Sequence, residues 1–577
     1  MQVRRIRLHN LAHPLNTLVV KLPLCGTKSE LPRDLGLLPK VWGPHDASAG
    51  IMAYVNYIKT FTLGISTIHT PSFLTSLDWI NFSPDMWSTV RRLLMLGLIA
   101  STLPAASGDV TNKSTKLRTV ITTDMEQDDL ASLIRYLLYT NELDTQGIIY
   151  TSSVYHWAGN GNGTSLRWTG TRTIEDNVLK AYAEVYPNLR RHDPSYPTPK
   201  ELLSTVKIGN IDFEGEMDHD TDGSDLIQAL LLDDDPRTLY LQAWGGTNTI
   251  ARALKSIEER YSDSRKRART KETISRKAVI MASGFQDTTY VDYIAPHWPQ
   301  IRVEEISAGY DTWGFNCNKG QGNVRGLPDD HLYFTGDWIK PNIEMGPYGK
   351  LYRAWLDGQS MPGDPLDIFG NATTAASGWC KPLGSYDFLS EGDNVAFNPL
   401  LTTGIQDPTN PNLGGWGGRA KQNTSSPDLW VMVDSETDQN GTKTDGYTTN
   451  RWIAAVQNDF AARMQWTVTP QYRNGNHAPS VHILNGSTVK GRPGMTVTLA
   501  GAVHDPDDDK VNSSWWQYVE EGTYPGAVAV TEHGRNQASV VIPANAEPGQ
   551  TISIILQGTD DGHFPLTRYD RVLIQVM

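Results

Sequence analysis

The stretch Arg118-Thr-Val-Ile-Thr-Thr-Asp-Met-Glu-Gln-Asp-Asp-Leu130 joins an apolar run to an amphipathic run through a short acidic turn. The apolar residues after the turn follow the i, i+3, i+4, i+7, i+8 spacing of one helix face, and they are Leu130, Leu133, Ile134, Leu137 and Leu138. The pattern predicts a strand, a tight turn and a helix, with Asp124, Asp128 and Asp129 at the turn. Open α/β sheets bind their ligands at the C-terminal ends of such strands.

Three carboxylates this close repel one another unless a cation neutralises them or their pKa values separate. The turn therefore predicts a hard-metal site, an acid/base site, or both. Simpler interpretations remain open: Asp128 and Asp129 also suit a helix N-terminus through its dipole, and Asp124 suits a helix cap.

Composition limits the class of protein. The chain has 577 residues, of which 39% are hydrophobic, enough for several cores. The net charge of −13 argues against nucleic acid as a partner, because phosphate binding requires a basic surface. Tryptophan is abundant, with 17 residues, and besides filling cores it is a common platform for sugar rings.

Residues 86–107 have the three parts of a secretory signal peptide. Arg91 and Arg92 form the charged part, Leu93 to Leu103 the apolar part, and Pro104-Ala-Ala106 the small residues for cleavage. The apolar run is shorter than the roughly 20 residues that a membrane span requires. Residues 1–85 are predicted to be a spurious or disordered extension, with Met86 the true start. The alternative is a buried helix of an N-terminal domain.

Sequons for N-glycosylation follow the predicted cleavage point, at Asn112, Asn162, Asn371, Asn423, Asn440, Asn485 and Asn512. They fit a secreted, extracellular glycoprotein. Without residues 1–85 the chain keeps Cys317 and Cys380, which either form one disulfide or stay as two buried thiols.

From 117 to 466 short apolar runs alternate with helical patterns. The predicted strands include 145–153, 238–244 and 277–283, and the predicted helices include 224–231 and 247–254. This alternation predicts an α/β fold with a mainly parallel sheet that has helices on both faces.

The pattern changes after residue 466. Residues 467–478 are rich in turn formers and are predicted to be a linker. Short strands alone follow in 479–577, among them 495–503, 538–542, 552–556 and 569–576, and predict an immunoglobulin-like β-sandwich. One loop of this part, Asp505-Pro-Asp-Asp-Asp509, is acidic enough to bind Ca²⁺, although a solvated turn explains it equally simply.

The acidic turn resembles the signature of the nucleoside hydrolase superfamily, Asp-x-Asp-x-Gly-x-Asp-Asp. Asp124, Asp128 and Asp129 match its last three aspartates, whereas Thr122 and Glu126 stand at its first aspartate and its glycine. Two later segments, Trp244-Gly-Gly-Thr-Asn248 and Ser390-Glu-Gly-Asp393, are similar to further family motifs in the same order.

The chain from 117 to 577 more closely resembles a subgroup of nucleoside hydrolase-like proteins described as cellulose-binding. These proteins carry an immunoglobulin-like module at the C-terminal end. The strings typical of the subgroup are Thr-Thr-Asp-Met-Glu, Leu-Leu-Tyr-Thr-Asn-Glu, Trp-Gly-Gly and Gly414-Gly-Trp-Gly-Gly-Arg419.

The resemblance implies a Ca²⁺ cofactor. Its ligands would be the carboxylates of Asp124, Asp128, Asp129 and Asp393 and the backbone carbonyl of Thr247. Asp124 would also be the catalytic base that takes a proton from a metal-bound water. Ca²⁺ accepts 6–8 oxygen ligands, which leaves room for water and sugar hydroxyls.

The resemblance fails at the residue that protonates the leaving group. The family has a histidine there, and this chain has Gly392. Three side chains are candidate acids in its place, each with a structural role as the alternative: Glu126, Glu391 and His156. The candidates for substrate binding are Asn248, Trp157, Trp244 and Trp416, with a helix cap or core packing as the alternatives.

The resemblance predicts a secreted, Ca²⁺-dependent hydrolase of N- or O-glycosidic bonds with a carbohydrate or glycoside ligand. The alternative is a non-catalytic carbohydrate-binding protein, specifically a cellulose-binding one, that keeps the metal turn. A third hypothesis is a structural adhesion module of the cell surface. The retained Asp124 favours the enzyme, and the lost histidine favours binding.

Overall fold

The structure is a computed structural model that describes residues 116–577, except for 263–264, 307–331, 365–383, 388–390, 434, 438–440 and 535. The predictions for 1–85, for the signal-like segment 86–107 and for Cys317 and Cys380 lie outside the described residues. Among the helices in the described ranges, none combines the length and the apolar character needed to cross a membrane.

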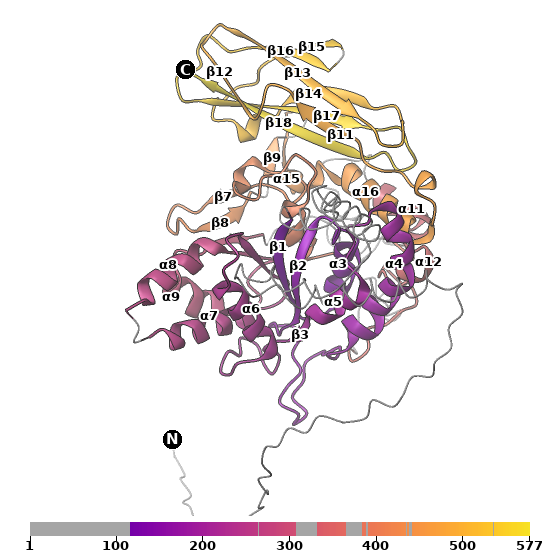
Figure 1. Cartoon of the computed structure of the whole chain (residues 1–577), viewed down its shortest axis with the longest axis vertical. Helices are drawn as coiled ribbons and strands as arrows, with labels where there is room; N and C mark the ends of the chain where they lie inside the picture. The colour runs from indigo at the N-terminus through magenta and orange to yellow at the C-terminus, as the bar shows by residue number, and fades with distance from the viewer. Residues whose placement is uncertain are drawn as a thin grey trace, which may run out of the picture. The chain divides into compact units, whose positions relative to one another are not determined.

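An eight-stranded sheet forms the centre of the first part, in the order β3-β2-β1-β4-β5-β6-β8-β7 (Figure 1). Its strands are β1 Leu117–Thr123, β2 Leu143–Tyr150, β3 Val206–Ile208, β4 Leu239–Ala243, β5 Ala278–Ala282, β6 Arg302–Glu305, β7 Ala420–Gln422 and β8 Leu429–Met432. All neighbours pair in parallel except β7, which is antiparallel to β8. The predicted fold class, α/β with a mainly parallel sheet, is therefore confirmed.

The strand order reverses direction beside β1. Strands β2 and β3 extend the sheet from one side of β1, and β4, β5 and β6 extend it from the other. A reversal of this kind opens a crevice at the carboxyl ends of the two central strands, where α/β proteins bind ligands. Asp124 directly follows β1, so the topology places the acidic turn at this position.

Helices cover both faces of the sheet because successive strand residues point to opposite sides. In β1, Val120 belongs to one hydrophobic core and Ile121 to the other. Helices α3 Gln127–Leu137, α4 Lys180–His192 and α16 Ile453–Val468 pack in the core of Ile121. Helices α6 Asp222–Leu232, α7 Asn248–Arg260 and α8 Arg267–Lys277 pack in the core of Val120.

The remaining short elements of this part are η1 Ile174–Leu179, α5 Pro199–Thr205, η2 Tyr290–Ile294, α9 Ala295–His297, α11 Gly336–Asn342, α12 Gly346–Gly349, α14 Asn394–Phe397, η4 Asn398–Leu400, η5 Pro411–Leu413, β9 Ser435–Thr437, β10 Lys443–Asp445 and α15 Tyr447–Asn450. Strands β9 and β10 form an antiparallel pair.

The C-terminal part is all-β, as expected. Two four-stranded sheets, β11-β13-β16-β15 and β12-β18-β17-β14, enclose their own core. The strands are β11 Ser480–Ile483, β12 Thr488–Gly491, β13 Thr496–His504, β14 Asn512–Gln517, β15 Val530–Gly534, β16 Gln537–Val541, β17 Thr551–Thr559 and β18 Thr567–Val576. A short helix, η7 Val519–Glu521, follows β14.

The segment 467–478 between the two parts includes the end of α16 and η6 Tyr472–Asn474. It is held by side chains of α4 and α16. His192 of α4 lies 2.6 Å from the Thr469 carbonyl through Nε2 and 3.0 Å from His477 through Nδ1. Trp466 donates to the Asn476 carbonyl at 3.0 Å. The turn formers that predict a linker here thus lie in a packed junction.

Candidate active site and metal centre

The acidic turn is held in a left-handed conformation at Met125, whose φ is +53°. Thr123 Oγ1 accepts a hydrogen bond from the Met125 amide at 3.0 Å and donates to Asp129 Oδ1. Thr169 donates to the Met125 carbonyl at 3.1 Å. A buried non-glycine residue with positive φ persists only where its surroundings fix it, and such strain clusters at functional sites.

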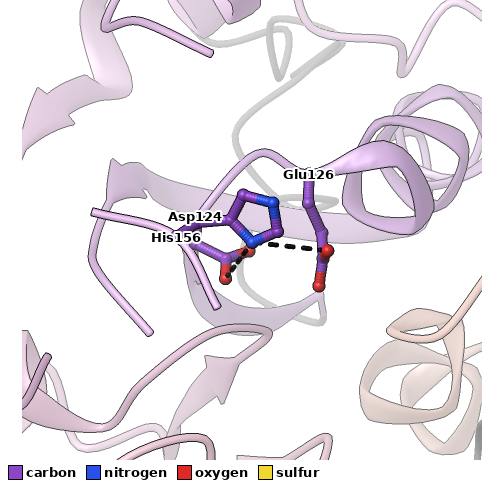
Figure 2. A group of neighbouring side chains, drawn as sticks. All are labelled: Asp124, Glu126 and His156. Carbon is purple, nitrogen blue, oxygen red and sulfur yellow. Dashed lines mark ion pairs between the residues drawn. The ribbon is translucent and has the colours of Figure 1, made fainter. Parts of the chain in front are cut away.

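His156 lies between the carboxylates of the turn (Figure 2). Its Nδ1 is 3.3 Å from Glu126 Oε2 and 3.6 Å from Asp124 Oδ2, and its Nε2 is 3.9 Å from Asp364 Oδ2. These distances are ion-pair distances rather than good hydrogen bonds. Burial opposes protonation, but the surrounding carboxylates outweigh it and raise the pKa of His156 to about 10.

The pKa values of the carboxyl groups at this site differ: that of Asp124 is lowered, and those of its neighbours are raised. Burial opposes ionisation of Asp124, but His156 overcomes it and lowers the Asp124 pKa. Burial and then the Asp124 charge raise the pKa of Asp128 to about 6. Burial and neighbouring carboxylates also raise the pKa values of Glu126, Asp129 and Asp393 well above their usual range.

Buried oxygens without partners support a cation at this site. Ligand atoms of Glu126, Asp128 and Asp129 lie within 4.8 Å of one another. Among the residues that the structure describes, both oxygens of Asp124 and the Oδ2 atoms of Asp129 and Asp393 accept no hydrogen bond, although all are buried. Buried polar atoms are nearly always satisfied, and oxygen atoms are the ligands that hard divalent cations prefer. The donor set fits a Ca²⁺-like ion.

Gly392, at the position of the missing histidine, has no room for a side chain. A Cβ atom there would lie 2.2 Å from Asp128 Oδ2. The backbone around it is also fixed, because Ser283 donates to the Gly392 carbonyl at 2.7 Å and the Asp393 amide donates to Ser132 at 3.2 Å. The Asp128 carboxylate therefore occupies the space that a side chain at 392 would need.

We expect Gly392→Ala to lower the free energy of unfolding by about 1–3 kcal/mol, because overpacking forces Asp128 to move. Gly384→Ala is a suitable control, since its Cβ would make an ordinary contact of 3.6 Å with Asp387. Urea denaturation of both variants measures the difference. Equal stability of the two variants would show that the Asp128 side chain moves aside without a loss of stability.

Glu391 forms a buried ion pair with Arg135. Its carboxylate accepts from Arg135 Nε at 2.5 Å and Nη2 at 2.7 Å, from Tyr352 at 2.6 Å and from Asn394 at 3.1 Å. Both charged side chains are fully buried. A carboxylate bound this way has a structural role and is poorly placed to protonate a leaving group.

Thr247 and Asn248, the predicted metal ligand and substrate contact, lie at the start of α7, which follows β4, the neighbour of β1 in the sheet. The Thr247 carbonyl accepts the Ala251 amide at 2.9 Å, the first hydrogen bond of the helix, which leaves one lone pair for another ligand. Asn248 is buried with all its side-chain bonds made: Oδ1 accepts from Thr151, and Nδ2 donates to Ser152 Oγ and to the carbonyls of Asn210 and Glu216.

The three candidate tryptophans lie in different surroundings. Trp244 is fully buried and packs edge-on against Tyr136, and Trp416 is also fully buried. The structure thus gives both a place in the core, with no face open to a sugar ring. Trp157 is half-buried, and its indole donates to the Thr164 carbonyl at 2.8 Å. Of the three, Trp157 alone keeps exposed surface.

Sequence reasoning missed two carboxylates near the site. Asp287 accepts from the Thr247 hydroxyl at 3.1 Å and from the Asn248 amide at 3.0 Å, so it orients the start of α7. Asp287 comes soon after β5, at the same edge of the sheet, and this position in the sequence could have indicated a site residue. Asp364 contacts His156 and forms a two-pronged ion pair with Arg167 at 2.9 and 3.0 Å, which no sequence pattern indicated.

An α/β sheet with an acidic, cation-fitting turn at its switch point, followed by a β-sandwich, defines a nucleoside hydrolase-like architecture. The family model "Cellulose-binding Sde182, nucleoside hydrolase-like domain" matches residues 118–420, more than half of the chain. The model "Cellulose-binding protein Sde0182, C-terminal domain" matches residues 496–576. The chain therefore belongs to the Sde182 family of nucleoside hydrolase-like, cellulose-binding proteins.

One similar solved structure agrees with this assignment. A nucleoside hydrolase-related hypothetical protein from Saccharophagus degradans, associated with carbohydrate metabolism, is 27% identical and has a TM-score of 0.61. The match covers 80% of this chain and 100% of that one. An inosine-guanosine nucleoside hydrolase matches at 10% identity and a TM-score of 0.27, over 61% of this chain and 98% of that one. No curated protein matches the chain.

Proposed function

We propose that the chain is a secreted hydrolase of N- or O-glycosidic bonds that depends on a divalent cation, Ca²⁺ being the best fit. The observation that carries the proposal is the group of buried carboxylate oxygens without hydrogen-bond partners at Asp124, Asp129 and Asp393. The signal-like segment and the sequons support secretion.

In this proposal Asp124 is the base. It lies at the end of the central strand β1, and its ionised form is favoured by His156. A bound cation would supply an acidified water and a positive field for sugar hydroxyls. Asp124 would accept the proton of that water and direct its oxygen toward an anomeric carbon, whose transition state resembles an oxocarbenium ion.

Glu126 is the best-placed acid for the leaving group. Its side chain is 14% exposed, while those of Asp124 and His156 are fully buried. His156 holds the Glu126 carboxyl from one side, as Figure 2 shows. Glu391, the other candidate carboxyl, is occupied by Arg135.

A non-catalytic carbohydrate-binding role is the second candidate. It is favoured by Gly392, where the Asp128 carboxylate fills the space of the family's acid. The family description as cellulose-binding also suits it. Under this alternative the cation would stabilise the turn, and carbohydrate would bind without being cleaved.

Metal removal separates the two candidates. We expect the chain, with Ca²⁺ present, to release sugar or base from a panel of nucleosides, p-nitrophenyl glycosides and cello-oligosaccharides. Chelation of the metal should lower the rate of release at least about 100-fold, because general acid–base catalysis contributes a factor of this order only in an assembled site. Added Ca²⁺ should restore the rate. Cellulose binding with no release from any member of the panel would favour the non-catalytic role.

A further inference from the structure

One end of the β-sandwich brings together three segments of the chain. The pairings Ser480 with His504, Asn512 with Thr559, and Thr559 with Thr567 place the ends of five strands there. The segment before β11, the β13–β14 loop 505–511 and the β17–β18 loop 560–566 therefore emerge side by side. This end lies more than half of the chain's length away in sequence from the acidic turn at 124–129, and it is built from different residues.

The β13–β14 loop carries a compact group of carboxylates. Ligand oxygens of Asp505, Asp507 and Asp509 lie within 4.8 Å of one another. Asp505 Oδ1 accepts the amides of Asp507 at 2.8 Å and Asp509 at 3.1 Å. Its other oxygen, Oδ2, is buried and has no hydrogen-bond partner among the described residues, and the whole side chain is only 4% exposed.

The two adjacent segments contribute further unsatisfied oxygens. Asp560 Oδ1 accepts from Asn476 Nδ2 at 2.9 Å, yet Asp560 Oδ2 and Asn476 Oδ1 are buried without a partner in the described parts of the chain. Asp560 is 2% exposed and Asn476 5%. Direct bonds tie these segments to the carboxylate loop, from the His477 amide to Asp507 at 2.7 Å and from the Lys510 amide to Asp561 at 2.9 Å.

A solvated acidic turn does not account for this arrangement. In such a turn the carboxylate oxygens face water, whereas here three oxygens from three segments are buried and unsatisfied. An unsatisfied buried charge is costly, and a group of carboxylate and amide oxygens matches the oxygen ligands that Ca²⁺ prefers. The His477 ring lies 2.9 Å from Asp507 Oδ2 at the edge of this group. Sulfur is absent from these named ligands, which makes a soft metal a poor fit.

We propose that this end of the sandwich binds a Ca²⁺ ion through Asp505, Asp507 and Asp509, with Asp560 and Asn476 completing the oxygen shell. The ion fastens the segment 467–478 to the sandwich, because Asn476 belongs to that segment, as does His477, whose amide donates to Asp507. This site is independent of the hydrolytic site proposed at Asp124.

Counting bound Ca²⁺ by equilibrium dialysis of the full chain tests the proposal. We expect Asp505→Asn, which keeps the shape of the side chain, to bind one ion fewer than the unmodified chain. Asp508→Asn is the matched control: Asp508 lies in the same loop, is exposed and has a φ of +64°, which asparagine tolerates. It should bind as many ions as the unmodified chain.

Two outcomes would overturn the proposal: an unchanged ion count in Asp505→Asn, or equal losses in Asp505→Asn and Asp508→Asn. If Asp505→Asn fails to fold, Asp509→Asn replaces it, because the Asp509 side chain is half-buried. The Asp124→Asn variant separates the two sites. It should retain the sandwich ion whether or not the hydrolytic proposal holds.

Discussion

Asp124→Asn is expected to lower kcat for glycoside or nucleoside hydrolysis by about 10²–10⁴-fold, the usual contribution of a general base. The amide has nearly the shape of the carboxylate but cannot accept the proton of an attacking water. It also removes one charge from the proposed cation shell. The activity that remains should therefore need at least as high a Ca²⁺ concentration as that of the unmodified chain. Initial rates at saturating Ca²⁺ measure the effect.

The comparison variant for Asp124→Asn is Asp234→Asn, which makes the same chemical change at an exposed aspartate. It should leave kcat within about twofold of the unmodified chain, since exposed charges contribute little. Binding of cellulose should survive in both variants. If Asp124→Asn hydrolyses the same substrates at the original rate, Asp124 is not the base and the enzymatic proposal loses its central residue.

Glu391→Gln is expected to destabilise the fold by about 3–5 kcal/mol, the usual cost of leaving a buried charge without its partner. Arg135 lies on α3, is fully buried, and donates twice to Glu391. Burial opposes its charge, but Glu391 outweighs that effect and raises the pKa of Arg135. The guanidinium therefore stays charged in the variant and loses its counter-charge.

Urea denaturation of Glu391→Gln should be compared with that of Glu272→Gln. Glu272 pairs with Arg276 at 3.2 Å, but the two side chains are 60% and 70% exposed. Such a surface pair contributes about 0–1 kcal/mol. The double variant Arg135→Met with Glu391→Leu should recover part of the lost stability, because both charges are gone. Equal losses in Glu391→Gln and Glu272→Gln would refute the assignment of Glu391 to the fold.

Local patterns were sufficient to predict the architecture. The period-3.6 run after Asp128 predicted a helix, observed as α3, and the short apolar runs at 145–153, 238–244 and 277–283 predicted strands, observed as β2, β4 and β5. These predictions succeeded because hydrophobic periodicity reports which face of an element is buried. The all-β C-terminal part was predicted for the same reason.

Local patterns were insufficient for the roles of single side chains. Trp244 and Trp416 flank glycine-rich turns and are predicted to bind substrate, but both are buried in the core. Glu391 lies within a segment similar to a family motif, yet its partner Arg135 is 256 positions away in the sequence. Contacts of this kind depend on how helices pack on the sheet, which no local pattern encodes.

The sequence alone determined that carboxylates gather after a central strand, that a sandwich follows, and that no histidine stands at position 392, because each of these depends on residue type and short-range spacing. The tertiary structure alone decided which carboxylate oxygens lack partners, that Asp128 fills the space at Gly392, and that Glu126 shares His156 with Asp124. The reason is physical: burial and the distance between residues far apart in the chain set the energy of a charge, and only the packed fold fixes both.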